Sequence, residues 1–89
     1  MVSESQMKTE IEGRVMSAEK KDYSIWTIGV TDNPSRRKEE HGKDHNVKYW
    51  MQWEADSETA ARNVEEYFIA KGMKGGEGGK GSADYVYIF

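Results

Sequence analysis

The chain has 89 residues, no cysteine and a formal net charge of −3. This length predicts one domain with a small core, and the lack of cysteine excludes disulfides and zinc sites built on thiolates. The acidic balance argues against unselective polyanion binding, and no apolar run is long enough to cross a bilayer, so we expect a cytoplasmic protein with no membrane partner.

The first third of the chain has the pattern of a strand hairpin. Residues 1–10 are polar without a period, and we expect a disordered N-terminal segment there. Ile11–Ser17 alternates apolar or small residues with polar ones, and Tyr23–Thr31 is rich in β-branched and aromatic residues. A charged turn separates the two segments, which together predict two antiparallel strands.

A short helix is predicted from Pro34 to His41. Asn33 can cap it with its side-chain oxygen, Pro34 suits the first helical position, and Gly42 suits a left-handed exit. Arg37 and His41 are four residues apart, so their side chains share one face of the helix. A permanent cation and a titratable imidazole therefore project together beside the end of a strand.

The remaining elements are a strand, a helix and a last strand. Alternation predicts a strand over Val47–Trp53, and an apolar stripe predicts a helix over about Glu58–Lys71, capped by Asp56 or Ser57. Tyr85–Phe89 has strand composition. The order β-β-α-β-α-β indicates one α+β domain over residues 11–89, with a small, largely antiparallel sheet flanked by helices.

The glycine-rich loop, residues 72–82, has the composition of a phosphate-binding loop but not its context. Gly81 follows Lys80 where such a loop needs Ser or Thr, and the segment leads into a strand rather than a helix. We therefore expect no nucleotide cofactor. The loop is either a flexible connection or a set of backbone donors for a nucleic-acid phosphate.

The stretch Thr27–His41, T-I-G-V-T-D-N-P-S-R-R-K-E-E-H, resembles the second half of the GIY-YIG nuclease signature. In that signature a Y-I-G strand is followed by a short polar turn, an arginine and, one helical turn later, a histidine. Glu65, three residues before the pair Phe68-Ile69, resembles the family's metal-binding glutamate. The resemblance covers roughly residues 11–72 and implies a GIY-YIG-like fold.

The resemblance also implies an activity, the cleavage of phosphodiester bonds with one Mg²⁺ or Mn²⁺ ion. Arg37 would neutralise charge on a phosphate, a task that suits a planar donor group that stays protonated. His41 would transfer a proton near neutral pH. Glu65 would hold the hard cation together with water and substrate oxygens.

The chain departs from the family at both signature tyrosines. The first motif would be Gly13-Arg14-Val15 and the second Thr27-Ile28-Gly29, so Val15 and Thr27 stand where the tyrosines would be. Tyr23 shares a strand face with Thr27 and is a geometric substitute. Tyr23 and Thr27 therefore join the candidate catalytic residues.

Basic residues gather around the short helix and the strand after it. Such a cluster favours weak, salt-dependent association with nucleic acid. Trp50 falls on the polar face of its strand, where it either packs under a helix or serves as a stacking platform. The candidate nucleic-acid-binding residues are Arg36, Lys38, Lys43, Lys48 and Trp50.

Three functions are compatible with these patterns. The first is a GIY-YIG-like, metal-dependent nuclease, which the retained arginine, histidine and glutamate favour. The second is a non-catalytic nucleic-acid-binding or protein-interaction module on the same fold, which the loss of both tyrosines favours. The third is an unrelated α+β interaction domain. In each case we expect a monomer.

Overall fold

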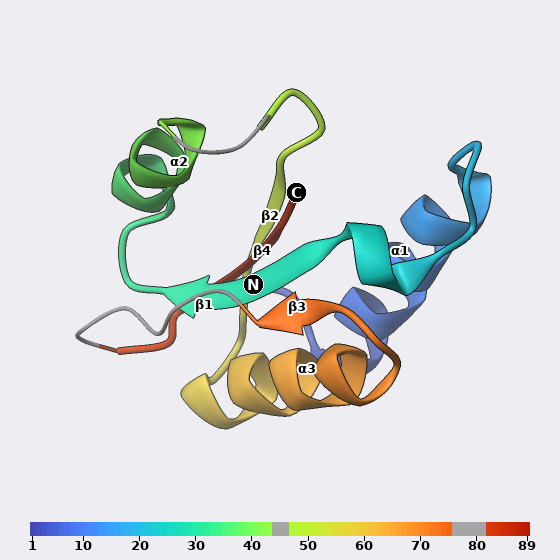
Figure 1. The fold of residues 1–89 in the computed structure, drawn as a ribbon. Helices are drawn as coiled ribbons and strands as arrows, with labels where there is room; N and C mark the ends of the chain where they lie inside the picture. Colours follow the sequence, from blue (N-terminus) through green and yellow to red (C-terminus); the bar gives the residue numbers. More distant parts are fainter. Residues whose placement is uncertain (44–46, 76–81) are drawn as a thin grey trace.

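The protein is an α+β domain, described here for residues 1–43, 47–75 and 82–89 of a computed structural model. The described part contains three α-helices and a four-stranded mixed sheet (Figure 1). The elements in chain order are α1 (Glu4–Ser17), the 3₁₀ turn η1 (Tyr23–Ile25), β1 (Thr27–Thr31), α2 (Pro34–Gly42), β2 (Met51–Glu54), α3 (Glu58–Ala70), β3 (Lys74–Gly75) and β4 (Tyr85–Ile88).

The strand order across the sheet is β2-β4-β1-β3. The strand β4 lies between β2 and β1 and is antiparallel to both, whereas β3 runs parallel to β1. The chain turns after α3 at Gly72, whose φ of 120° favours glycine, and the backbone N–H of Lys74 then donates to the carbonyl of Trp26. The sheet is therefore mixed, where the sequence suggested a largely antiparallel one.

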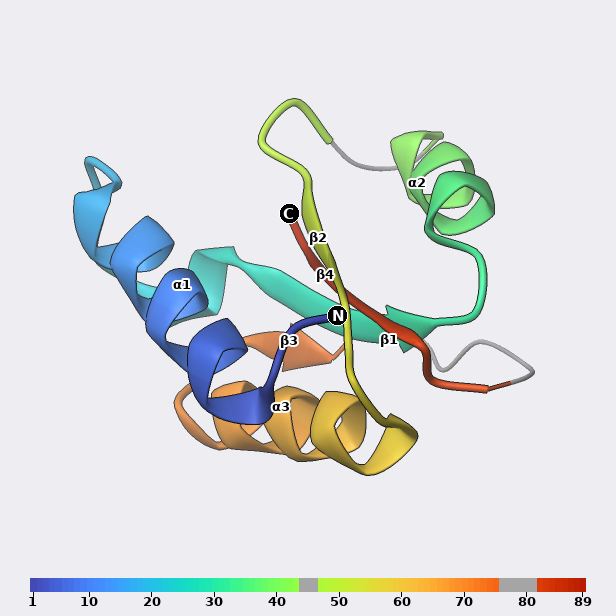
Figure 2. The ribbon, with the colours of Figure 1, turned by 180° about the vertical axis from the view of Figure 1, so that it is seen from behind.

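The two faces of the sheet have different neighbours. One face carries Ile28, Val30, Val86 and Ile88, which belong to a single buried cluster with side chains of α1 and α3. The other face carries Gly29 of β1 and its cross-strand partner Tyr87 of β4. In both views α2 lies away from α1 and α3, on the other side of the strands (Figure 2).

The structure overturns two expectations for the start of the chain. Residues 4–10 are not disordered, and Ile11–Ser17 is not a strand, because α1 runs through both segments with Ser3 as its cap. Met7, Ile11 and Val15 are all fully buried. These residues are four positions apart, which places them on one helical face. Ile11 and Val15 also fall on one face of an alternating strand, so the alternation from Ile11 onward fits both structures.

Two other predicted strands are shorter than expected. The segment Tyr23–Thr31 is divided, because Asp22 accepts from the backbone of Ser24 and holds the turn η1, so that only β1 is extended. The strand predicted over Val47–Trp53 begins at Met51 and extends to Glu54. No hairpin therefore precedes β1, and the element order is not β-β-α-β-α-β.

The local signals at the other helices are confirmed. The side chain of Asn33 accepts from the N–H of Arg36 at the start of α2, and that of Ser57 accepts from Ala60 at the start of α3. Most of the stripe predicted on α3 is buried, with Phe68 fully so, whereas Tyr67 is partly buried. Gly42, however, is the last residue of α2 rather than a left-handed exit.

The predicted final strand is confirmed as β4, and part of the glycine-rich loop is also extended, as β3. Residues 76–81 of that loop lie outside the described part of the chain. Among the described helices, none has the length and apolarity that a membrane span requires.

Candidate functional site

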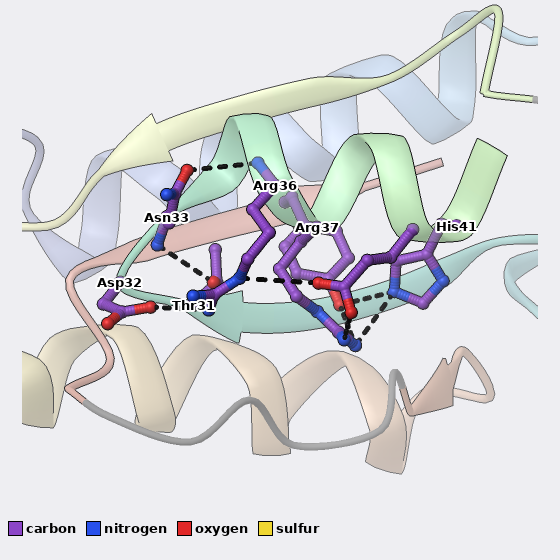
Figure 3. Close-up of polar contacts among 8 residues, drawn as sticks. Thr31, Asp32, Asn33, Arg36, Arg37 and His41 are labelled. Atoms are coloured by element: carbon purple, nitrogen blue, oxygen red, sulfur yellow. Dashed lines mark hydrogen bonds and ion pairs between the residues drawn. The ribbon is translucent and has the colours of Figure 1, made fainter.

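The candidate site forms where α2 leaves the end of β1. The hydroxyl oxygen of Thr31 accepts from the N–H of Asn33, and the side chain of Asn33 in turn caps α2 (Figure 3). Thr31 is only 2% exposed. Because this buried residue holds Asn33 and Asn33 caps α2, the end of β1 determines where α2 begins and which way it runs. This arrangement aims Arg37 and His41 at the face of the sheet that carries Tyr87.

Arg37, His41 and Tyr87 form one hydrogen-bonded cluster. Nη2 of Arg37 lies 3.1 Å from Nε2 of His41, which lies 3.0 Å from the hydroxyl of Tyr87. A longer contact of 3.5 Å joins Nη2 of Arg37 to the same hydroxyl. Tyr87 is separated from His41 by 46 positions in the sequence, so strand pairing rather than local spacing completes the cluster.

The direction of the hydrogen bonds in the cluster depends on the tautomer of His41. Arginine can only donate, whereas Nε2 of His41 offers at most one lone pair, which cannot fully serve both Arg37 and Tyr87. Burial raises the pKa of Tyr87, the nearby Arg37 guanidinium opposes this shift, and the carboxylates of Glu65 and Glu40 add to it. Tyr87 is therefore a protonated donor at neutral pH.

Aromatic rings close over this cluster. Trp50 stacks on Tyr87 with centroids 4.5 Å apart and planes 7° apart, and it also lies over Phe89 at 5.6 Å. The ring of His41 packs against Phe89 at 4.7 Å. The sequence left two alternatives for Trp50, packing under a helix or serving as a stacking platform. In the structure Trp50 covers the rings of Tyr87 and Phe89 and stays partly exposed.

Gly29 leaves the space that the ring of Tyr87 occupies. A Cβ atom built at Gly29 would lie 2.5 Å from Cζ of Tyr87 and would also overlap its hydroxyl oxygen. Any side chain at this position would therefore displace the ring. The glycine of the T-I-G motif is a requirement of the cluster, since the cross-strand tyrosine lies flat across it.

The other candidate catalytic residues are not part of this cluster. Tyr23 lies in η1 and packs on Phe68, with the ammonium of Lys71 over its ring. Thr27 is the first residue of β1 and is partly buried, and its backbone exchanges hydrogen bonds with Phe89. The sequence offered Tyr23 as the substitute tyrosine, whereas the tyrosine that contacts Arg37 and His41 is Tyr87.

The signal for Tyr87 was present in the sequence but incomplete. Strand alternation in Y-V-Y-I-F places Tyr85, Tyr87 and Phe89 on one face. Nothing local says that this strand pairs with β1. The other motif position, Val15, lies buried in α1 and contributes to the core.

The predicted basic residues do not form a uniform patch. The Arg36 guanidinium lies 3.0 Å from Asp32 and 3.5 Å from Glu40, and its side chain is 49% exposed. The side chain of Arg37 is only 13% exposed and reaches Glu40 at 3.6 Å. The remaining lysines of the set, Lys38, Lys43 and Lys48, are exposed.

Glu65 is partly buried on α3. Burial raises the pKa of its carboxyl, and the positive charge of Arg62 only partly offsets this. Within the described residues Glu65 has no hydrogen bond or ion pair. Residues 1–43, 47–75 and 82–89 contain no group of three or more His, Asp or Glu side chains that could hold a metal. A protein-built metal cage is thus not formed by these residues, whereas Mg²⁺ needs only one or two carboxylates plus water and substrate oxygens. Whether Glu65 holds such an ion stays a prediction.

No protein-family model, curated protein or solved structure matches this chain.

Proposed function

We propose that this domain binds the phosphodiester backbone of nucleic acid at the Arg37–His41–Tyr87 cluster and acts as a GIY-YIG-like, metal-dependent nuclease with slow turnover. The observation that carries the proposal is the convergence of these three side chains, joined by contacts of 3.0 to 3.5 Å. Arginine, imidazole and phenol together can bind a phosphate and move a proton beside it.

Each residue has a role that follows from its contacts. Arg37 donates to a phosphate oxygen and neutralises charge as it develops in the transition state. His41, which is partly exposed, takes a proton from the attacking water, and the buried hydroxyl of Tyr87 positions the imidazole ring through the 3.0 Å contact with Nε2. Water then forms the new bond to phosphorus, and the bond to the leaving oxygen breaks. A Mg²⁺ or Mn²⁺ ion held by Glu65 and substrate oxygens would polarise the phosphoryl group.

Glu65 supports this reading through its environment. A partly buried carboxylate with a raised pKa and no partner among the described residues is destabilised by its own charge. A bound divalent cation would remove that penalty. The negative charge of Glu65 also raises the pKa of Tyr87. Glu65 is therefore coupled electrostatically to the cluster, although α3 packs on the other face of the sheet.

A non-catalytic nucleic-acid-binding module is the second candidate. The replacement of both signature tyrosines favours it, and the described residues bring no three His, Asp or Glu side chains together in a group that could hold a metal. The two candidates differ in cleavage and agree in binding, so one set of variants tests both.

The test compares Arg37→Ala with Arg36→Ala. The two arginines are neighbours on α2, but only Arg37 reaches the cluster. Binding of a labelled oligonucleotide, measured by fluorescence anisotropy at low and high salt, should weaken much more for Arg37→Ala. Cleavage in Mg²⁺ or Mn²⁺ should fall about 10²-fold for Arg37→Ala and should also fall for Glu65→Gln.

Equal binding losses in the two arginine variants would overturn the proposed phosphate site. Binding that depends on Arg37 without any metal-dependent cleavage would support the non-catalytic candidate instead. A metal response that survives Glu65→Gln would remove Glu65 from the site.

A further inference from the structure

Trp50 is the outer layer of an aromatic stack on the face of the sheet that carries Tyr87. Tyr87 and Phe89 lie two positions apart with their planes 11° apart, and the indole lies over both of them. Tyr87 is fully buried, whereas Trp50 remains partly exposed. One face of the indole therefore lies on these rings, and the side chain as a whole is partly exposed.

The orientation of this indole is fixed before any ligand arrives. Its Nε1–H donates to the side-chain oxygen of Gln52 at 3.0 Å, and the rings beneath it prevent it from tilting inward. A flat, partly exposed ring held in this way offers a stacking surface at little entropic cost. Nucleobases stack on such surfaces whatever their sequence, since every base has an aromatic face.

The stacking surface is adjacent to the proposed phosphate site. The ring of His41 is 6.3 Å from that of Trp50, and His41 is in contact with Arg37. A nucleotide whose base lies on Trp50 would therefore have its phosphate beside Arg37. In the interior of a duplex both faces of each base are covered by neighbouring pairs, so an unpaired base offers the indole a free face far more readily.

We propose that Trp50 stacks an unpaired nucleobase, so that the substrate class of the site is single-stranded or locally unpaired nucleic acid. This inference rests on the proposed function, because it assumes that Arg37 receives the phosphate. It adds a preference for unpaired strands, which phosphate contacts alone would not give.

The experiment uses the intrinsic fluorescence of the full chain. Trp26 and Trp53 are only 5% and 7% exposed, so quenching by an added strand reports on Trp50. The probes are a single-stranded thymidine oligonucleotide, an abasic strand of the same length and a blunt duplex. The thymidine strand should quench the emission and bind most tightly, whereas the abasic strand, which keeps the phosphates, should bind more weakly without quenching.

Two variants separate stacking from packing. Trp50→Leu keeps an apolar cover over Tyr87 but removes the ring, and it should weaken thymidine-strand binding roughly 5- to 100-fold with little change for the duplex. Trp50→Phe keeps a smaller ring, so anisotropy should show intermediate affinity while the quenching is lost. The near-ultraviolet dichroism of Trp26 and Trp53 checks that each variant is folded.

The possible outcomes separate a failure of base stacking on Trp50 from a failure of the proposed phosphate site. Equal affinity for thymidine and abasic strands, with binding still dependent on Arg37, would overturn base stacking and leave the phosphate site intact. Equal losses for single strand and duplex in Trp50→Leu would also overturn it. If no probe binds at low salt, the proposed function fails and the inference fails with it.

Discussion

The close approach of Gly29 and Tyr87 makes a quantitative prediction about the site. The substitution Gly29→Ala introduces a methyl group 2.5 Å from Cζ of Tyr87, well inside van der Waals contact. The ring cannot retreat freely, because Trp50 is stacked on it at 4.5 Å and His41 packs beside it at 5.5 Å. Overpacking of this kind costs about 1 to 3 kcal/mol of unfolding free energy.

A double-mutant cycle isolates this clash. Tyr87→Val removes the ring but keeps a β-branched residue in β4, so a methyl group at position 29 then has room. We expect Gly29→Ala to be destabilising in the native background and neutral or slightly stabilising in the Tyr87→Val background. The coupling energy should therefore be about 1 to 3 kcal/mol, measured by urea unfolding with unchanged m-values.

Gly13→Ala is the matched control. Gly13 lies in α1, and a Cβ atom there would meet nothing within 4 Å. This substitution should stabilise the protein by about 0.5 to 1 kcal/mol, the usual gain from replacing glycine in a helix. Equal costs for Gly29→Ala in the presence and absence of the Tyr87 ring would show that the ring does not lie across Gly29, and the cluster as described would then be wrong.

Two further predictions concern α3. Phe68→Ala should cost about 3 to 5 kcal/mol in thermal or urea unfolding because Phe68 is fully buried, whereas Ile69→Ala, at a residue 42% exposed, should cost less than about 1 kcal/mol. Similar costs would mean that α3 faces the core differently. Because burial raises the pKa of Glu65, the folded state binds that proton more tightly than the unfolded state, and stability is lost as pH rises through the folded pKa. In buffer that contains a chelator, Glu65→Gln should therefore be more stable than the native protein at about pH 7, with the difference vanishing near about pH 3. A constant offset across this range would refute the burial of Glu65.

The elements predicted correctly from sequence are those whose ends are fixed by local chemistry. The caps at Asn33 and Ser57 and the stripe ending at Phe68 all act within one or two turns, so composition alone locates α2 and α3. The alternation in Y-V-Y-I-F likewise identifies β4. These signals need no knowledge of the partner surface.

The error at Ile11–Ser17 arises because two periodicities fit the same residues. Ile11 and Val15 are four apart, which satisfies both a strand face and a helix face. The choice is made by burial, since Met7, one turn earlier, joins them beneath α3 and extends the stripe to helical length. That contact is tertiary, so the segment could not be assigned from its own alternation.

The candidate site also has one part that local sequence predicts and one part that depends on tertiary structure. The spacing of Arg37 and His41 is local, and it correctly placed both side chains on one face of α2. The third member, Tyr87, reaches them because β4 pairs with β1 and the register sets Tyr87 opposite Gly29. Strand order is a property of the whole sheet, so no motif around position 37 could have revealed it.

The cluster needs both the side chains of α2 and the residues that strand pairing brings to them. A peptide covering α2 alone would carry the arginine and the histidine but would lack the hydroxyl that bonds to Nε2 of His41. It would also lack Gly29, whose missing side chain lets the phenol lie flat across β1, and the aromatic rings that pack against His41. The chemistry proposed for Arg37 and His41 therefore belongs to the folded sheet rather than to the helix that carries them, because the helix contributes two of the three groups and strand pairing contributes the third.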